Sequence, residues 1–113
     1  MGTILIDKLL SACVERRASD LYLTAGAPPM LRVQGQLQRF GRKVLKPADT
    51  HLLMECVTPY RSRQEFLETG NADFEFGFGE VCRFHVSVIR GRENVAMAVR
   101  RIPKKNGNMD QQR

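Results

Sequence analysis

Two runs of alternating apolar and polar residues, joined by a short turn, constrain this chain most strongly. They occupy residues 82–102 and are typical of a β-hairpin. With Gly91-Arg92 as a two-residue loop, the hairpin places Phe84 opposite Val99 and Arg83 opposite Arg100. One face then belongs to the core. The other face carries two adjacent arginines beside small alanines, so it predicts a floor on which an anion can lie.

The preceding segment extends this sheet. Residues 73–78 alternate with three phenylalanines on one face, and a tight turn at Gly79 pairs them with the strand that begins at Cys82. The predicted register sets Phe74 opposite Phe84 and Glu75 opposite Arg83. It also sets Phe76 opposite Cys82 and Asp73 opposite His85.

The rest of the chain reads as helices and short strands. We expect helices over residues 3–17 and 47–57, and a third that Thr58 caps and Gly70 ends. Leu52, Cys56 and Leu67 should face the core. Strands are predicted at 20–24, 30–33 and 37–40, with Gln34-Gly35 as a hairpin turn. This order predicts a single α+β domain over residues 1–103 with a largely antiparallel sheet, followed by a polar, disordered tail at 104–113.

Composition excludes several classes of function. No apolar run reaches the ~20 residues of a membrane span, and no signal peptide opens the chain, so we expect a cytoplasmic protein. The phosphate-binding GxxxxGK[ST] motif is missing, and no serine lies in a nucleophile motif. His51, expected at the surface, and His85 lie far apart in sequence and predict no metal site. The chain has three cysteines, and an odd number argues against a framework of disulfides. The chain alone is therefore not expected to be an enzyme.

Several segments resemble the N-terminal domain of PilT-type ATPases, the type IV pilus retraction (twitching-motility) motors of the type II/IV secretion ATPase superfamily. The resemblance covers about residues 4–103. It rests on residues 18–26 (ASDLYLTAG), on Pro28-Pro29 and Arg32-Val33, and on Phe66-Leu67-Glu68 followed by Asp73-Phe74; residues 83–87 (RFHVS) and 100–103 (RRIP) complete it. The chain departs from the usual pattern at Tyr22, where the family has His, and at His85, where it has Arg.

The resemblance implies a PAS-like domain followed by a RecA-like catalytic domain, in a homohexamer that hydrolyses ATP with Mg²⁺ and drives pilus subunits back into the membrane. The isolated chain would need no cofactor. Its partners would be its own RecA-like domain, the neighbouring subunits and the pilus inner-membrane machinery, with the assembly peripheral at the inner membrane. Arginines of the N-terminal domain reach the nucleotide in this family, and Arg100, Arg83 and Arg92 are the candidates here.

Other interpretations stay open at this point. Arg83 can be a plain cross-strand partner of Glu75, whereas Arg100 has no acidic residue opposite in the predicted register and suits a phosphate better. Tyr22 is either a half-exposed strand residue or part of a domain contact. The net charge of +6 also fits a free-standing nucleic-acid-binding module, and a PAS-like sensor is a further alternative. Because the phenylalanines point to the core face rather than lying among the arginines, we expect no nucleic-acid partner.

Overall fold

The structure is a computed structural model that describes residues 6–92 and 94–103. The elements occur in the order α1 (Ile6–Glu15), β1 (Asp20–Leu23), β2 (Met30–Val33), β3 (Gln36–Arg39), α2 (Pro47–Val57), α3 (Tyr60–Thr69), β4 (Asn71–Phe78), β5 (Cys82–Arg90) and β6 (Val95–Pro103). The predicted helix over residues 3–17 begins at Ile6 in the described part. The predicted tail at 104–113 lies outside the described residues. No helix in the described ranges is long and apolar enough to cross a membrane.

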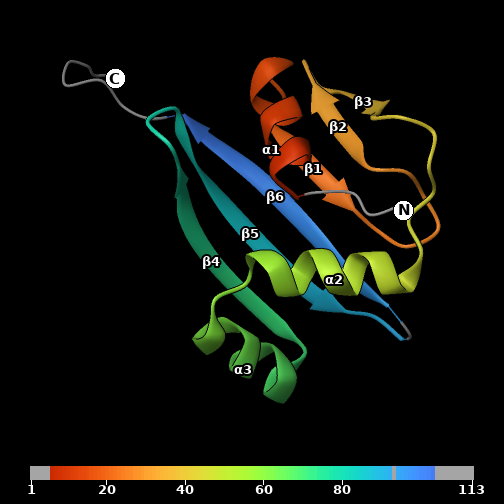
Figure 1. Ribbon diagram of the computed structural model, residues 1–113, viewed down its shortest axis with the longest axis vertical. Coiled ribbons are helices and arrows are strands. Elements are labelled where there is room, and N and C mark those ends of the chain that lie inside the picture. The colour runs from red at the N-terminus through yellow and green to blue at the C-terminus, as the bar shows by residue number, and fades with distance from the viewer. Residues whose placement is uncertain (1–5, 93, 104–113) are drawn as a thin grey trace.

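One six-stranded sheet carries the fold, in the order β3-β2-β1-β6-β5-β4. Every neighbouring pair is antiparallel, which confirms the predicted α+β class. The last strand, β6, lies between β1 and β5, so the first and last strands of the chain meet in the middle. Figure 1 shows α1 and α2 packed on one face of the sheet and α3 beside the beginning of β4. The opposite face of the sheet has no helix over it among the described residues.

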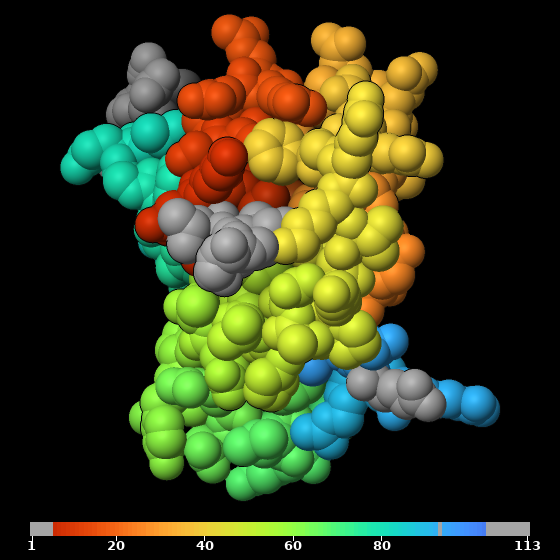
Figure 2. All heavy atoms as spheres, turned by 45° about the vertical axis from the view of Figure 1, so that its right-hand side comes forward, coloured from red at the N-terminus to blue at the C-terminus, as the bar shows by residue number. Residues whose placement is uncertain are grey.

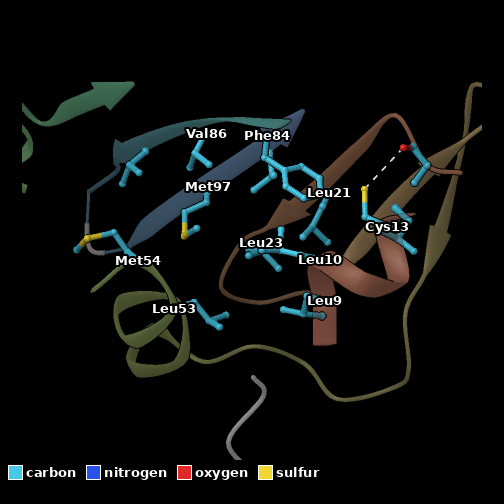
Figure 3. Close-up of a cluster of buried hydrophobic side chains, with 14 of the residues drawn as sticks. Leu9, Leu10, Cys13, Leu21, Leu23, Leu53, Met54, Phe84, Val86 and Met97 are labelled. Carbon is cyan, nitrogen blue, oxygen red and sulfur yellow. Dashed lines mark hydrogen bonds between the residues drawn. The ribbon is translucent and has the colours of Figure 1, made fainter. Parts of the chain in front are cut away.

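The core lies between the sheet and helices α1 and α2. Leu9 and Leu10 of α1 and Leu53 of α2 are almost fully buried, and Figure 3 shows them directed at side chains of β1, β5 and β6. The strands supply the other half of this cluster, namely Leu21, Leu23, Phe84, Val86, Val88, Met97 and Val99. Burying this many aliphatic side chains, at about 1.5–3 kcal/mol each, is the main favourable contribution to folding.

The register of the β5–β6 hairpin differs from the prediction by two residues. Val86 faces Val99, and Arg100 faces His85 instead of Arg83. The connection spans residues 91–94, and the Gly91 N–H donates to the carbonyl of Asn94 at 2.7 Å. The Gly91-Arg92 pair is compatible with a two-residue type II′ turn, which has glycine first, so these two residues do not by themselves exclude the predicted loop. Because the side-chain period is two, the hydrophobic pattern cannot distinguish these registers.

The β4–β5 register is also shifted by two residues. Phe76, not Phe74, faces Phe84, and Phe78 faces Cys82. The Phe84 ring lies 5.8 Å from that of Phe76 and 5.5 Å from that of Phe78, between ring centroids. Two predicted opposite-charge contacts survive as diagonal neighbours: Arg83 Nε lies 3.5 Å from Glu75 Oε1, and His85 Nε2 lies 3.2 Å from Asp73 Oδ1.

The helix ends agree with the prediction better than the helix faces do. Helix α2 has the predicted bounds; Pro47 opens it, and the Asp49 carboxylate accepts the Lys46 N–H at 2.8 Å. Gly70 ends α3 in the left-handed conformation. The predicted Thr58 cap is wrong, because Pro59 is the N-cap and the buried Thr58 hydroxyl has no hydrogen-bond partner in the described part of the chain.

The predicted apolar stripes of α2 and α3 are partly wrong. Leu52, Cys56 and Leu67 are exposed, whereas Phe66 and Cys13 are buried as expected. Helix α2 instead presents Thr50, Leu53 and Met54 to the core. The buried set and the predicted set both have the spacing of one helix face. The predicted set is more apolar, because it has Leu52 and Cys56 where the buried set has Thr50.

Candidate functional site

The open face of the sheet, on the side away from α1 and α2, holds the candidate functional site. Strand alternation sends the polar residues of five strands to this face, as the register shows. Their charges form bands across the sheet: acidic on β4, basic on β5 and β6, acidic on β1 and basic on β2. The residues are Asp73 and Glu75, Arg83, His85 and Ser87, Ala98 and Arg100, Asp20 and Tyr22, and Arg32.

A hollow of about 250 Å³ lies at the centre of this face. Its lining comes from β1, β5 and β6, namely Asp20, Tyr22, His85, Ser87, Ala98 and Arg100. Ala98 has the smallest side chain of the set, so it leaves space between the longer side chains of its neighbours. The lining therefore surrounds a small space with hydrogen-bond donors of three kinds: guanidinium, imidazole and hydroxyl.

Asp20 connects the charged residues around the hollow, and the sequence analysis did not predict this role. The residue is only 8% exposed and lies between two arginines, because β1 has β6 on one side and β2 on the other. Its Oδ1 accepts from Arg100 Nε at 3.4 Å, and its Oδ2 lies 3.9 Å from Arg32 Nε. The Ser19 hydroxyl donates to Oδ2 at 2.7 Å. The expectation that Arg100 lacks an acidic partner is therefore wrong.

Tyr22 is half-buried, as one of the two interpretations predicted. Arg32 lies over its ring at 5.7 Å from the centroid, and Arg32 Nε donates to the Tyr22 hydroxyl at 3.4 Å. Arg32 also donates to the carbonyl of Gly35 at 3.1 Å. These contacts hold the guanidinium of Arg32 beside Tyr22, which lines the hollow.

His85 stands between two carboxylates of β4. Its Nε2 lies 3.2 Å from Asp73 Oδ1, and its Nδ1 lies 3.7 Å from Glu75 Oε2. The Ser87 hydroxyl donates to Asp73 at 2.6 Å, and this bond, together with His85, holds the pKa of Asp73 below its ordinary value against the opposing effect of partial burial. The β4 edge of the hollow is therefore a hydrogen-bonded acidic cluster.

The three candidate arginines do not converge. Arg100 borders the hollow, and its side chain is 74% exposed. Arg83 is its diagonal neighbour across β5 and β6 and is exposed beside Glu75. Arg92 lies in the β5–β6 loop, which Figure 2 shows as a projection from the body of the molecule. Since Gly91, at the start of that loop, is eight residues from Arg83 along an extended strand, the two are about 27 Å apart.

The described residues contain no group of three or more His, Cys, Asp or Glu side chains arranged to hold a metal ion. On the open face, the His85 imidazole lies against Asp73 and Glu75, and the Ser87 hydroxyl donates to Asp73. The donors left for a ligand are those of the largely exposed Arg100 guanidinium, and such a planar fork suits the oxygens of an anion such as phosphate.

Known proteins resemble this chain in both sequence and fold. The type IV pilus retraction ATPase PilT of Pseudomonas aeruginosa is 33% identical over 106 residues, which make up 94% of this chain and 31% of that protein. The type IV pilus ATPase PilU of the same organism is 34% identical over 96 residues, or 85% of this chain and 25% of that protein. No protein-family profile matches the chain.

Solved structures agree with the sequence comparison. The crystal structure of the pilus retraction motor PilT with bound ADP superposes with a TM-score of 0.79 at 36% identity, over 94% of this chain and 30% of that one. The Legionella pneumophila ATPase DotB shares the fold, with a TM-score of 0.77 at 19% identity. The chain thus spans about a third or less of each of these proteins. By sequence and by fold, this chain is an N-terminal domain of the PilT-type secretion ATPases.

Proposed function

We propose that the chain is the non-catalytic N-terminal part of a hexameric ATPase motor that powers type IV pilus retraction. The observation that carries this proposal is the similarity to PilT over 94% of the chain, in sequence and in fold. On this proposal the domain is PAS-like, and ATP and Mg²⁺ bind to a RecA-like domain that follows it. Its partners are that domain, the neighbouring subunits and the pilus inner-membrane machinery, and the motor works in the cytoplasm at the periphery of the inner membrane.

In this motor, Arg100 contacts the phosphates of ATP. Its guanidinium is largely exposed at the rim of the hollow, and its one described ion pair, with Asp20, uses Nε at 3.4 Å. The rest of the planar donor fork is therefore available for phosphate oxygens. Arg83, its diagonal neighbour, and Arg92, in the projecting loop, are the secondary candidates.

The test of this role pairs stability with catalysis. Arg100→Ala should change the unfolding free energy of the 113-residue chain by no more than about 0.5 kcal/mol, since the side chain is mostly exposed. In the complete motor, the same change should lower ATP hydrolysis at least tenfold. One lost donor to developing phosphoryl charge is worth about 2–4 kcal/mol.

Arg61→Ala is the matched control, because Arg61 is an exposed arginine on α3, away from the hollow. It should leave both quantities unchanged. Hydrolysis at the parental rate by Arg100→Ala would reject the nucleotide role, and unfolding of the isolated chain would assign Arg100 a structural one.

A free-standing nucleic-acid-binding module is the weaker candidate. Single-stranded nucleic acids are bound by aromatic rings that lie among basic residues on an exposed face. Here the rings of Phe76, Phe78 and Phe84 pack together on the helix side of the sheet, opposite Arg83 and Arg100. On the open face, Tyr22 is engaged by Arg32.

A further inference from the structure

Strand β4 is an outer strand of the sheet, and among the described residues no strand pairs with its outer side. It is eight residues long and contains neither proline nor lysine, two residues that natural edge strands use to prevent pairing with another chain. The other outer strand, β3, has only four residues and ends in Arg39. In Figure 1, α3 lies beside the beginning of β4, and no other described helix or strand lies beyond it.

In the described part of the chain, the acidic residues of β4 have basic partners on one side of the strand only. Within the sheet, Asp20 lies between Arg32 and Arg100, and so is flanked by basic residues on both neighbouring strands. Glu75 pairs with Arg83 of β5 at 3.5 Å, and Asp73 pairs with His85 at 3.2 Å. Within residues 6–92 and 94–103, the ion pairs of both carboxylates are with β5 alone. Their side chains remain 46% and 62% exposed. A strand added outside β4 would complete the alternation if it carried basic residues at the facing positions.

The other face of β4 is apolar and incompletely covered. Phe74, Phe76 and Phe78 are half-buried, although the residues they face on β5 are fully buried or nearly so. Phe74 and Phe76 stack with centroids 6.4 Å apart, and Phe76 leans on Phe84. The phenylalanine row is therefore packed from the β5 side and open on its outer side. Apolar residues of an added strand would cover it.

We propose that β4 binds an extended segment of a partner protein as a seventh strand, one that alternates basic and apolar residues. The backbone groups on the outer side of β4 supply the affinity common to any added strand. The row of Asp73 and Glu75 and the row of phenylalanines supply its specificity. A second copy of this chain does not fit, because pairing β4 with itself brings four carboxylates together on one face.

The probe is a synthetic peptide of alternating lysine and valine, nine residues long like β5. The chain has a net charge of +6, so long-range electrostatic repulsion opposes the binding of this cationic peptide, and non-specific charge attraction cannot explain it. We expect saturable binding, with new hydrogen-exchange protection confined to backbone amides of β4. Two control peptides should fail: the same sequence with alternate backbone nitrogens methylated, which cannot pair as a strand, and a peptide of alternating glutamate and valine.

A matched double variant, Asp73→Asn with Glu75→Gln, keeps the side-chain shapes and removes both charges. It should bind the lysine peptide at least tenfold more weakly and keep the circular dichroism spectrum of the parent. The proposal is overturned if the methylated peptide binds as well as the unmethylated one, if the double variant binds with parental affinity, or if no binding is detected. Dimerisation of the peptide-free chain through β4, seen by sedimentation and by protection of the same amides, would also overturn it.

Discussion

Phe84→Ala should destabilise the domain more than any other single phenylalanine truncation in β4 or β5. Phe84 is fully buried, and its ring contacts those of Phe76 and Phe78. Truncating a buried phenylalanine costs about 3–5 kcal/mol, from lost transfer free energy plus the cavity that remains. A domain of 113 residues has a total stability of about 6–17 kcal/mol at typical values per residue. The substitution therefore removes a large fraction of the stability.

Urea unfolding followed by circular dichroism measures this loss, since the chain has no tryptophan to report by fluorescence. Phe78→Ala is the matched control: the same truncation on an outer strand, at a half-buried position in contact with the same ring. It should cost about half as much, because part of the transfer term is already lost to solvent. A cost below about 1 kcal/mol for Phe84→Ala, or a larger cost for Phe78→Ala, would refute the packing described here.

Two further predictions concern pH. Burial raises the pKa of the Cys13 thiol from 9.0 to about 11, so the unfolded chain ionises first and stability should fall as pH rises from about 9 to 11, by up to about 3 kcal/mol. Urea titrations at pH 8 and 10 should show a smaller loss for Cys13→Ala than for the parent, and equal losses would contradict the assignment. The Ser87 hydroxyl and His85 lower the pKa of Asp73, so this carboxylate stabilises the fold above about pH 4, and its contribution disappears as pH falls through the lowered pKa. Ser87→Ala should raise the pKa of Asp73 in an NMR titration, and an unchanged value would show that the hydroxyl is not the cause.

Local signals in the sequence predicted the secondary structure well, because caps and turns act over a few residues. Pro47 at the start of α2 and Gly70 at the end of α3 are such signals, and both are confirmed. The turn at Gln34-Gly35 is another, since both residues have the positive φ that this hairpin turn requires. Register could not be predicted in the same way. In β4–β5 and β5–β6, a shift of two residues leaves every side chain on its predicted face, so only the length of the turn decides.

The candidate site was predicted only in part, for a related reason. Alternation places Arg100 and Arg83 on the polar face in either register, and that placement is correct. The neighbour of Arg100 on its other side could not be inferred, because Asp20 lies 80 residues earlier and β1 reaches β6 only through the topology of the whole sheet. The available signal was an aspartate at the first position of a predicted strand, on the face opposite Leu21 and Leu23.

The position of Asp20 affects the free energy with which any anion binds to Arg100. The guanidinium already has a carboxylate beside it, and Asp20 itself is shared with Arg32. A phosphate that takes the Nε donor of Arg100 exchanges one charge-assisted hydrogen bond for another, and the released carboxylate keeps Arg32 and the Ser19 hydroxyl as partners. Because one bond replaces another, this exchange through Nε gains less free energy than a contact with the donors of the same guanidinium that are unpaired among the described residues. On the proposed function, the phosphate contact of Arg100 therefore depends on those unpaired donors.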